Sequence, residues 1–109
     1  MEAQTPQEFF ENILPARFKP EKAAGITTVT QINVSGPEGG SWTVTVKDQK
    51  ITVTEGVNSS AELILKMSLL DFMDLVNGKL SAEKAFFTGK VQFKGNIAVA
   101  LKLKDAGFL

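Results

Sequence analysis

The most informative part of the chain runs from Asn77 to Asn96 and reads NGKLSAEKAFFTGKVQFKGN. Ser81 is a good N-cap residue, and the helix that it begins is expected to run to Phe87 or Thr88 before Gly89 ends it. Polar and apolar residues alternate over residues 90–94, which predicts a strand. Gly95 and Asn96 then lead into a last helix over residues 97–104. The stretch therefore predicts a helix, a strand and a second helix in close succession.

Two further helices are expected before this stretch. Ser68 is an N-cap candidate with Asp71 three residues on, and the apolar stripe that follows runs to Val76, where Asn77-Gly78 ends the helix. Near the N-terminus, Thr5 is an N-cap, Pro6 occupies the first helical position and Glu8 completes a capping box. Phe9, Phe10, Ile13 and Leu14 then share one apolar stripe. Pro15 is expected to interrupt this helix, with a short turn following before Gly25.

Between these helices, four segments alternate between apolar and polar residues, over residues 28–34, 42–47, 51–54 and 61–67. A glycine-rich loop over residues 35–40 and a tight turn over residues 47–50 separate the first three. Such alternation is typical of antiparallel strands with one face on a core and the other largely in water. With residues 90–94 the sequence predicts an α+β fold, a five-stranded sheet covered by helices on one face.

The expected last helix carries too many apolar residues for a simple cover helix. Apolar side chains surround most of it, and its charged residues are Lys102, Lys104 and Asp105. A cover helix needs only an apolar stripe. Three explanations stay open at this point: protein core on both sides, contact with a partner, or contact with an apolar ligand.

Composition excludes several kinds of protein. The 109 residues are 43% hydrophobic and 22% charged, which is typical of one globular domain. The longest apolar run covers only residues 97–101, far short of the roughly 20 residues of a membrane-spanning helix. The chain has no cysteine, histidine or tyrosine, so we expect no metal site and no cofactor chemistry, and catalysis would depend on carboxylates, lysines and serines.

The charges balance overall but not locally. Twelve basic and twelve acidic residues give a net charge of zero, which argues against nucleic-acid binding. From Lys79 to Lys104, however, the chain carries six lysines and the single acidic residue Glu83. This surplus is either a solvated face or a rim that attracts an anionic head group or an anionic membrane surface.

Two stretches resemble the sterol carrier protein type-2 domain family. SGPEGGSWTV, from Ser35 to Val44, is similar to the family's glycine loop before a strand that bears a tryptophan. The stretch from Asn77 to Asn96 is similar to the more specific signature, in which Gly-Lys-Leu, Ala-Phe-Phe, Gly-Lys and Lys-Gly-Asn follow one another. The resemblance spans nearly the whole chain, which we expect to form one domain over residues 1–109.

The resemblance implies an apolar tunnel between the sheet and the helices, which holds fatty acids, fatty acyl-CoA, sterols or phospholipids without chemistry on them. The family's longer members continue beyond the last helix, so Phe108 and Leu109 are candidates to close the tunnel. The candidate tunnel residues are apolar and come from every expected helix and from the last strand: Phe10, Leu14, Phe72, Val76, Phe86, Phe87, Phe93, Ile97, Ala100 and Leu101. For Phe86 and Phe87, a place in the protein core is the alternative.

Lys102 and Lys104 are the candidate head-group rim, because they lie on the apolar last helix. The expected partners are a long-chain lipid and, transiently, a membrane surface. The chain shows no signal peptide, no membrane-spanning helix and no C-terminal peroxisomal tripeptide, and we expect a cytoplasmic protein.

Two other functions stay open. The chain is an accessory module that presents a lipid to a partner enzyme, or a small enzyme such as a thioesterase. The second would need Asp71 or Glu83 as a base, although both lie at helix N-termini where capping already explains an acidic residue.

Overall fold

The computed structural model describes residues 2–107 and has one five-stranded sheet. The strand order is β3-β2-β1-β4-β5. The strands are β1 (Thr28–Ser35), β2 (Gly40–Lys47), β3 (Lys50–Glu55), β4 (Leu63–Ser68) and β5 (Val91–Lys94). The helices are α1 (Pro6–Glu8), the π-helix η1 (Phe9–Ile13), α2 (Leu14–Arg17), the 3₁₀ helix η2 (Pro20–Lys22), α3 (Leu69–Val76), α4 (Ala82–Phe87) and α5 (Ile97–Asp105).

The sheet is mostly antiparallel, as predicted, with one parallel pair. β3 pairs with β2, β2 with β1 and β4 with β5 in antiparallel fashion, whereas β1 and β4 run parallel. The parallel pair arises because the chain leaves the edge strand β3 and crosses the polar face of the sheet to reach β4. On this crossing, the Asn58 N–H donates to Gln31 Oε1 (3.2 Å) and Thr43 Oγ1 donates to the Gly56 carbonyl (3.0 Å). The crossing buries both Gln31 and Thr43.

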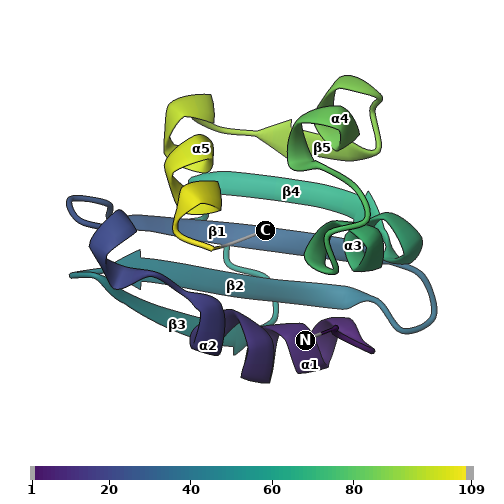
Figure 1. The fold of residues 1–109 in the computed structure, drawn as a ribbon, viewed down its shortest axis with the longest axis horizontal. Helices are drawn as coiled ribbons and strands as arrows, with labels where there is room; N and C mark the ends of the chain where they lie inside the picture. The colour runs from purple at the N-terminus through teal and green to yellow at the C-terminus, as the bar shows by residue number, and fades with distance from the viewer. Residues whose placement is uncertain (1, 108–109) are drawn as a thin grey trace.

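The opposite face of the sheet is apolar and carries the helices. Figure 1 shows α4 and α5 at the end of the sheet where β4 and β5 lie, and α1 and α2 toward β2 and β3. Within the described residues 2–107, no helix is long and apolar enough to cross a membrane; the longest of them, α5, has nine residues.

The helix starts follow the capping residues that the sequence predicts. Backbone N–H groups of Glu8, Asp71 and Lys84 donate to the side-chain oxygens of Thr5, Ser68 and Ser81, at 3.1–3.2 Å. Asn96 caps α5 by accepting from the N–H groups of Ala98 and Val99. Local chemistry therefore fixes where these helices begin.

The expectation at Pro15 was wrong. The helical segment passes through Pro15 and ends at Arg17. It can continue past the proline because the residues just before it form the wider π-helix η1. Proline lacks the N–H that an α-helix needs at this position, and a π-helical turn accommodates the interruption without a break. The extended backbone of Phe18 ends the segment instead.

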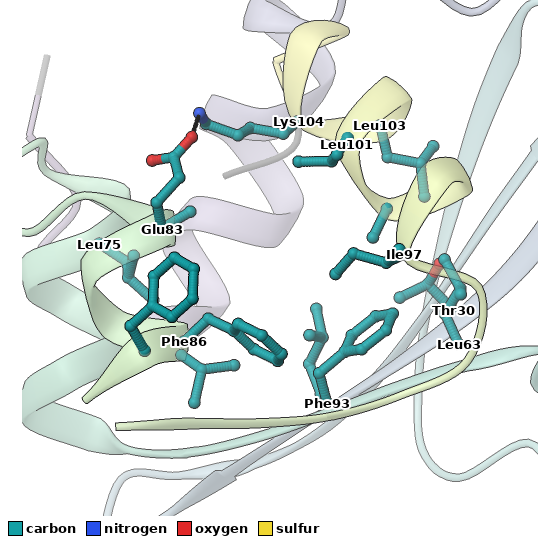
Figure 2. Close-up of a pocket in the computed structure, with 15 residues that line it drawn as sticks. Thr30, Leu63, Leu75, Glu83, Phe86, Phe93, Ile97, Leu101, Leu103 and Lys104 are labelled. Carbon is teal, nitrogen blue, oxygen red and sulfur yellow. Dashed lines mark hydrogen bonds and ion pairs between the residues drawn. The ribbon is translucent and has the colours of Figure 1, made fainter. Parts of the chain in front are cut away.

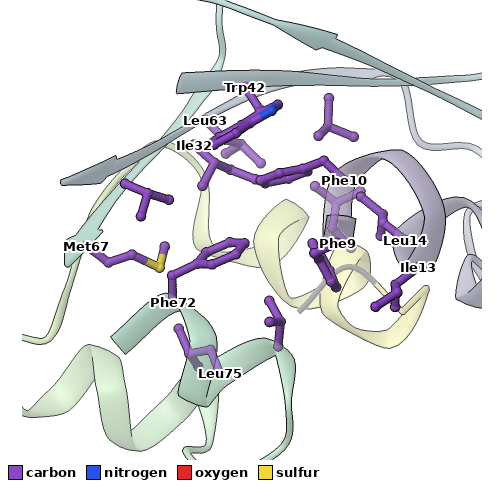
Figure 3. Close-up of a cluster of buried hydrophobic side chains, with 14 of the residues drawn as sticks. Phe9, Phe10, Ile13, Leu14, Ile32, Trp42, Leu63, Met67, Phe72 and Leu75 are labelled. Atoms are coloured by element: carbon purple, nitrogen blue, oxygen red, sulfur yellow. The ribbon is translucent and has the colours of Figure 1, made fainter. Parts of the chain in front are cut away.

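The core is a cluster of aromatic rings beneath the central strands (Figure 3). Phe9, Phe10 and Phe72 are fully buried, and the Phe10 ring stacks on Trp42 with 4.9 Å between ring centroids. Phe9 meets Phe72 edge-on at 5.7 Å. The contacts join the N-terminal helical segment and α3 to β2, and so fix these helices on the sheet.

Candidate functional site

An apolar cavity of about 330 Å³ lies under α4 and α5, against β1, β4 and β5. Figure 2 shows the side chains that surround it, with Phe86 and Phe93 on one side and Ile97 and Leu101 on the other. Its polar lining residues are limited to three, Thr30, Glu83 and Lys104. The remaining lining residues are apolar: Leu63, Leu65, Leu75, Ala82, Phe86, Phe87, Val91, Phe93, Ile97, Ala100, Leu101 and Leu103.

The cavity exists because α5 is only loosely covered. Leu103 is its single fully buried side chain, whereas Ile97 is 51% and Leu101 50% exposed. The apolar circumference of α5 is therefore not enclosed by protein on both sides. Part of it faces the cavity, so contact with a partner and contact with an apolar ligand both stay open.

An ion pair joins the two helices at the edge of the cavity. The Lys104 ammonium of α5 donates to a Glu83 carboxylate oxygen on α4, as the dashed line in Figure 2 marks. The hydrogen bond from Lys104, followed by the backbone N–H of Glu83 itself, lowers the pKa of the Glu83 carboxyl. Glu83 is therefore held ionised and bound to a cation, which makes it a poor proton acceptor.

A second, more polar hollow of about 470 Å³ adjoins the cavity and shares Leu75, Ala82, Glu83 and Lys104 with it. It also contains Arg17, whose Nε donates to the Gly107 carbonyl at 2.8 Å. A second nitrogen of the guanidinium donates to the Val76 carbonyl at 3.2 Å. Partial burial lowers the pKa of the Arg17 guanidinium. Two cations, Arg17 and Lys104, thus border the hollow beside the apolar cavity.

A family model described as the SCP-2 sterol transfer family matches residues 10–106. The chain belongs to this family. It is 39% identical over 77 residues to hydroxysteroid dehydrogenase-like protein 2 of Rattus norvegicus, across 70% of this chain and 15% of that protein. It is 32% identical over 85 residues to sterol carrier protein 2 of Homo sapiens, across 78% of this chain and 16% of that protein. The chain thus spans about a sixth of the length of these SCP-2 relatives.

Solved structures carry the same SCP-2 fold. The palmitated SCP2L2 from Aedes aegypti superposes with a TM-score of 0.72 and 26% identity, over 94% of each chain. The sec-alkylsulfatase Pisa1 from Pseudomonas sp. superposes with a TM-score of 0.81, over 95% of this chain and 16% of that one. At 21% identity the second likeness shows the fold alone.

The structure brings most of the predicted tunnel and rim residues of this SCP-2 domain together. The cavity is lined by seven of them, namely Phe86, Phe87, Phe93, Ile97, Ala100, Leu101 and Lys104. Lys102 lies exposed on α5, outside the lining. Phe108 and Leu109, the candidates for closing a tunnel, lie outside the described residues.

Four predicted tunnel residues lie elsewhere. Phe10, Leu14 and Phe72 belong to the fully buried aromatic and aliphatic core, and Val76 borders the polar hollow. The apolar sides of these helices do point inward, but there the space between the helices and the sheet is filled by side chains from both of them. We therefore leave these four out of the proposed ligand site.

Several lining residues were missed. Leu63 and Leu65 belong to the alternating segment over residues 61–67, which predicted only a strand with one face on the core, although the same alternation places them under the cavity. Thr30 could not be recognised as a lining residue from the sequence, since threonine is common in strands. Arg17 was not a candidate because nothing in the sequence brings it to Gly107, 90 residues away along the chain.

The two carboxylates considered as a catalytic base are not placed for proton transfer in the cavity. Within residues 2–107 there is no group of three or more His, Cys, Asp or Glu side chains that could hold a metal ion. Asp71, the other carboxylate considered as a base, lies on the first turn of α3 and is not among the cavity lining residues. The arrangement is suited to enclosing an apolar molecule rather than to proton transfer.

Proposed function

We propose that residues 1–109 form a single lipid-binding domain that holds a long-chain lipid in the apolar cavity under α4 and α5, without chemistry on it. Fatty acids, fatty acyl-CoA, sterols and phospholipids are the candidate ligand classes, delivered through transient contact with a membrane surface. The observation that carries the proposal is the cavity lining, which is apolar except for Thr30, Glu83 and Lys104. Membership of the SCP-2 sterol transfer family supports the same function.

Desolvation supplies the affinity in this proposal. Burying one methylene is worth about 0.8 kcal/mol, so a sixteen-carbon chain offers roughly 12 kcal/mol before entropy costs. One methylene more or less changes affinity only a few-fold. The domain should therefore bind several long-chain lipids and discriminate weakly by chain length.

An anionic head group would be held at the border between the cavity and the polar hollow. Lys104 lines both, and its ammonium can exchange Glu83 for a carboxylate or phosphate of the ligand. Arg17 lies in the same hollow, and Lys102 is exposed on the same helix. The head group would thus face cations while the acyl chain extends beneath α4 and α5.

A titration of delipidated protein with a fluorescent long-chain fatty acid tests this proposal, followed by displacement with palmitoyl-CoA and with a sterol. Saturable binding of one lipid per chain is the expected result. Two variants of α5 locate the site: Ala100 lines the cavity, whereas Ala98 is exposed on the same helix. Ala100→Trp should fill the cavity and abolish binding, and Ala98→Trp should leave it intact. Equal affinity in both variants would place the lipid elsewhere.

The alternative is an accessory module that presents a lipid to a partner enzyme. The observation in its favour is that SCP-2 relatives contain this domain as about a sixth of a longer chain. A pull-down with delipidated protein tests it, because a module that works through protein contact should retain its partner after the lipid is removed. A carrier that acts alone should not retain one.

A further inference from the structure

Exposed apolar side chains gather at the opening of the cavity. Within the described residues, six large apolar side chains are exposed, and four of them line the cavity: Phe86, Phe87, Ile97 and Leu101. A side chain that lines the cavity and is also exposed to solvent lies at its opening. Phe86 is on one side of the cavity and Ile97 and Leu101 are on the other (Figure 2). An apolar patch of this kind is typical of a surface that contacts a membrane or another protein.

Exposed lysines lie beside this apolar patch on both helices. Lys84 precedes Phe87 by three residues on α4, so the two side chains project from the same side of the helix. Lys90 follows Phe87 by three residues, beyond the turn that ends α4. Lys102 comes directly after Leu101 on α5. All three lysines are exposed, so each helix at the opening presents cations next to apolar side chains.

Carboxylates do not balance these three cations. The ion pairs within residues 2–107 involve Lys79 and Lys104, and neither pair includes the three lysines. Between Lys79 and the end of α5 the acidic residues are Glu83, which Lys104 already binds, and Asp105. The four apolar residues and the three lysines, which we call the opening face, therefore carry surplus positive charge. A second copy of the opening face would repel the first.

We propose that the opening face docks on an anionic bilayer, with Phe87 inserted among the acyl chains and the three lysines at the lipid phosphates. The inference rests on the proposed lipid-binding function and names the surface and the membrane charge for it. Apolar side chains leave water at a bilayer interface, while lysine ammonium groups stay at anionic head groups. Docking places the cavity opening against the bilayer, so that an acyl chain enters without crossing water.

Co-sedimentation with vesicles tests the proposal, using phosphatidylcholine alone or mixed with an equal amount of phosphatidylserine. The wild type should bind the mixed vesicles more tightly, and added salt should weaken this binding. The double variant Lys84→Glu, Lys90→Glu reverses two charges outside the cavity lining. Each lysine near an anionic leaflet is worth about a fivefold change in affinity, so the double variant should bind roughly 25-fold more weakly.

The chain offers a matched control at the opposite edge of the sheet. Lys47 and Lys50 are exposed at the ends of β2 and β3, and Lys47→Glu, Lys50→Glu makes the same change in net charge. Because salt screens charges beyond about 10 Å, this control should bind the mixed vesicles nearly as well as the wild type.

A tryptophan at the opening face tests insertion. The fluorescence of Phe87→Trp should shift to shorter wavelengths on mixed vesicles, because the indole enters an apolar environment. Val57→Trp should show no shift, since Val57 is exposed on the crossing between β3 and β4, on the face of the sheet opposite the helices. A shift in both variants, or in neither, would contradict the proposed orientation.

Two failures can be told apart. Titration with a fluorescent fatty acid in the absence of vesicles measures lipid binding alone, and if the wild type binds none, the proposed function is wrong. If it binds the fatty acid but not the mixed vesicles, or if the double variant and its control lose vesicle binding equally, the docking inference is overturned. A wild-type dimer that Phe87→Ala dissociates would show a second copy on the opening face and would also overturn it. Thermal unfolding of each variant shows whether it is folded.

Discussion

The molecule contains two clusters of phenylalanines that differ in how completely they are enclosed. In the first cluster, Phe9, Phe10 and Phe72 are all fully buried. In the second, Phe86 of α4 meets Phe87 and Phe93 at ring-centroid distances of 5.9 and 6.3 Å, yet Phe87 is 84% exposed. Both clusters contain edge-on pairs, and Phe10 also stacks on Phe72 in the first. Contact between the rings therefore occurs in both clusters and does not account for the difference in exposure.

The difference comes from what covers each cluster. The first lies over the middle of the sheet, between the N-terminal helical segment, α3 and Trp42. The second lies over the edge strand β5, which has four residues, beneath the six-residue helix α4 and the loosely covered α5. One end of the sheet is therefore closed by packed side chains, and the other end leaves apolar surface exposed, where we propose that a lipid binds.

The largest effect should come from a truncation in the enclosed cluster. Phe10→Ala removes a fully buried ring that stacks on Trp42 and Phe72, and should lower the free energy of unfolding by about 3–5 kcal/mol. Phe86→Ala removes a ring that is 43% exposed and should cost much less. Chemical denaturation measures both. Equal losses would show that the two clusters are packed alike.

The next effect concerns lipid affinity. Phe86→Ala removes part of the cavity wall and should weaken binding of a fluorescent fatty acid several-fold, since less apolar surface is buried on binding. Leu70→Ala is the control, because Leu70 is an exposed apolar residue on α3 and lies outside the cavity lining. A similar loss in both variants would point to a general effect of surface apolarity.

The smallest effect should come from the ion pair at the edge of the cavity. The pKa of Glu83 lies below its ordinary value of 4.5, so the ion pair stabilises the fold above that value and this contribution is lost as the pH falls through the lowered pKa. Glu83→Gln should therefore lower the thermal midpoint slightly at pH 7, and this difference should shrink as the pH falls below 4.5. A difference that stays the same as the pH is lowered would show that the charge of Glu83 is not involved.

Local signals made much of the fold predictable. Ser68, Ser81 and Asn96 begin helices through contacts within three residues, and strand alternation needs only neighbouring positions. The parallel pairing of β1 with β4 was not predictable in this way, because the crossing that produces it depends on contacts between Asn58 and Gln31.

The site was predictable only in part. The apolar circumference of α5 left protein core, a partner and an apolar ligand open, and the tunnel role of Phe86 and Phe87 came from the family resemblance. Periodicity shows that a side chain points inward but not whether another side chain fills the space opposite. For that reason Phe10 and Phe72 looked the same in sequence as Phe93, although they are packed on all sides and Phe93 lines the cavity.

The most direct test is a map of backbone amide chemical shifts in delipidated protein during titration with palmitate. The account predicts the largest changes in residues 82–87, 91–93 and 97–104, with small changes around Phe10 and Leu14. Changes centred on the N-terminal helical segment, with none in α4 and α5, would contradict the claim that the loosely covered end of the sheet holds the lipid.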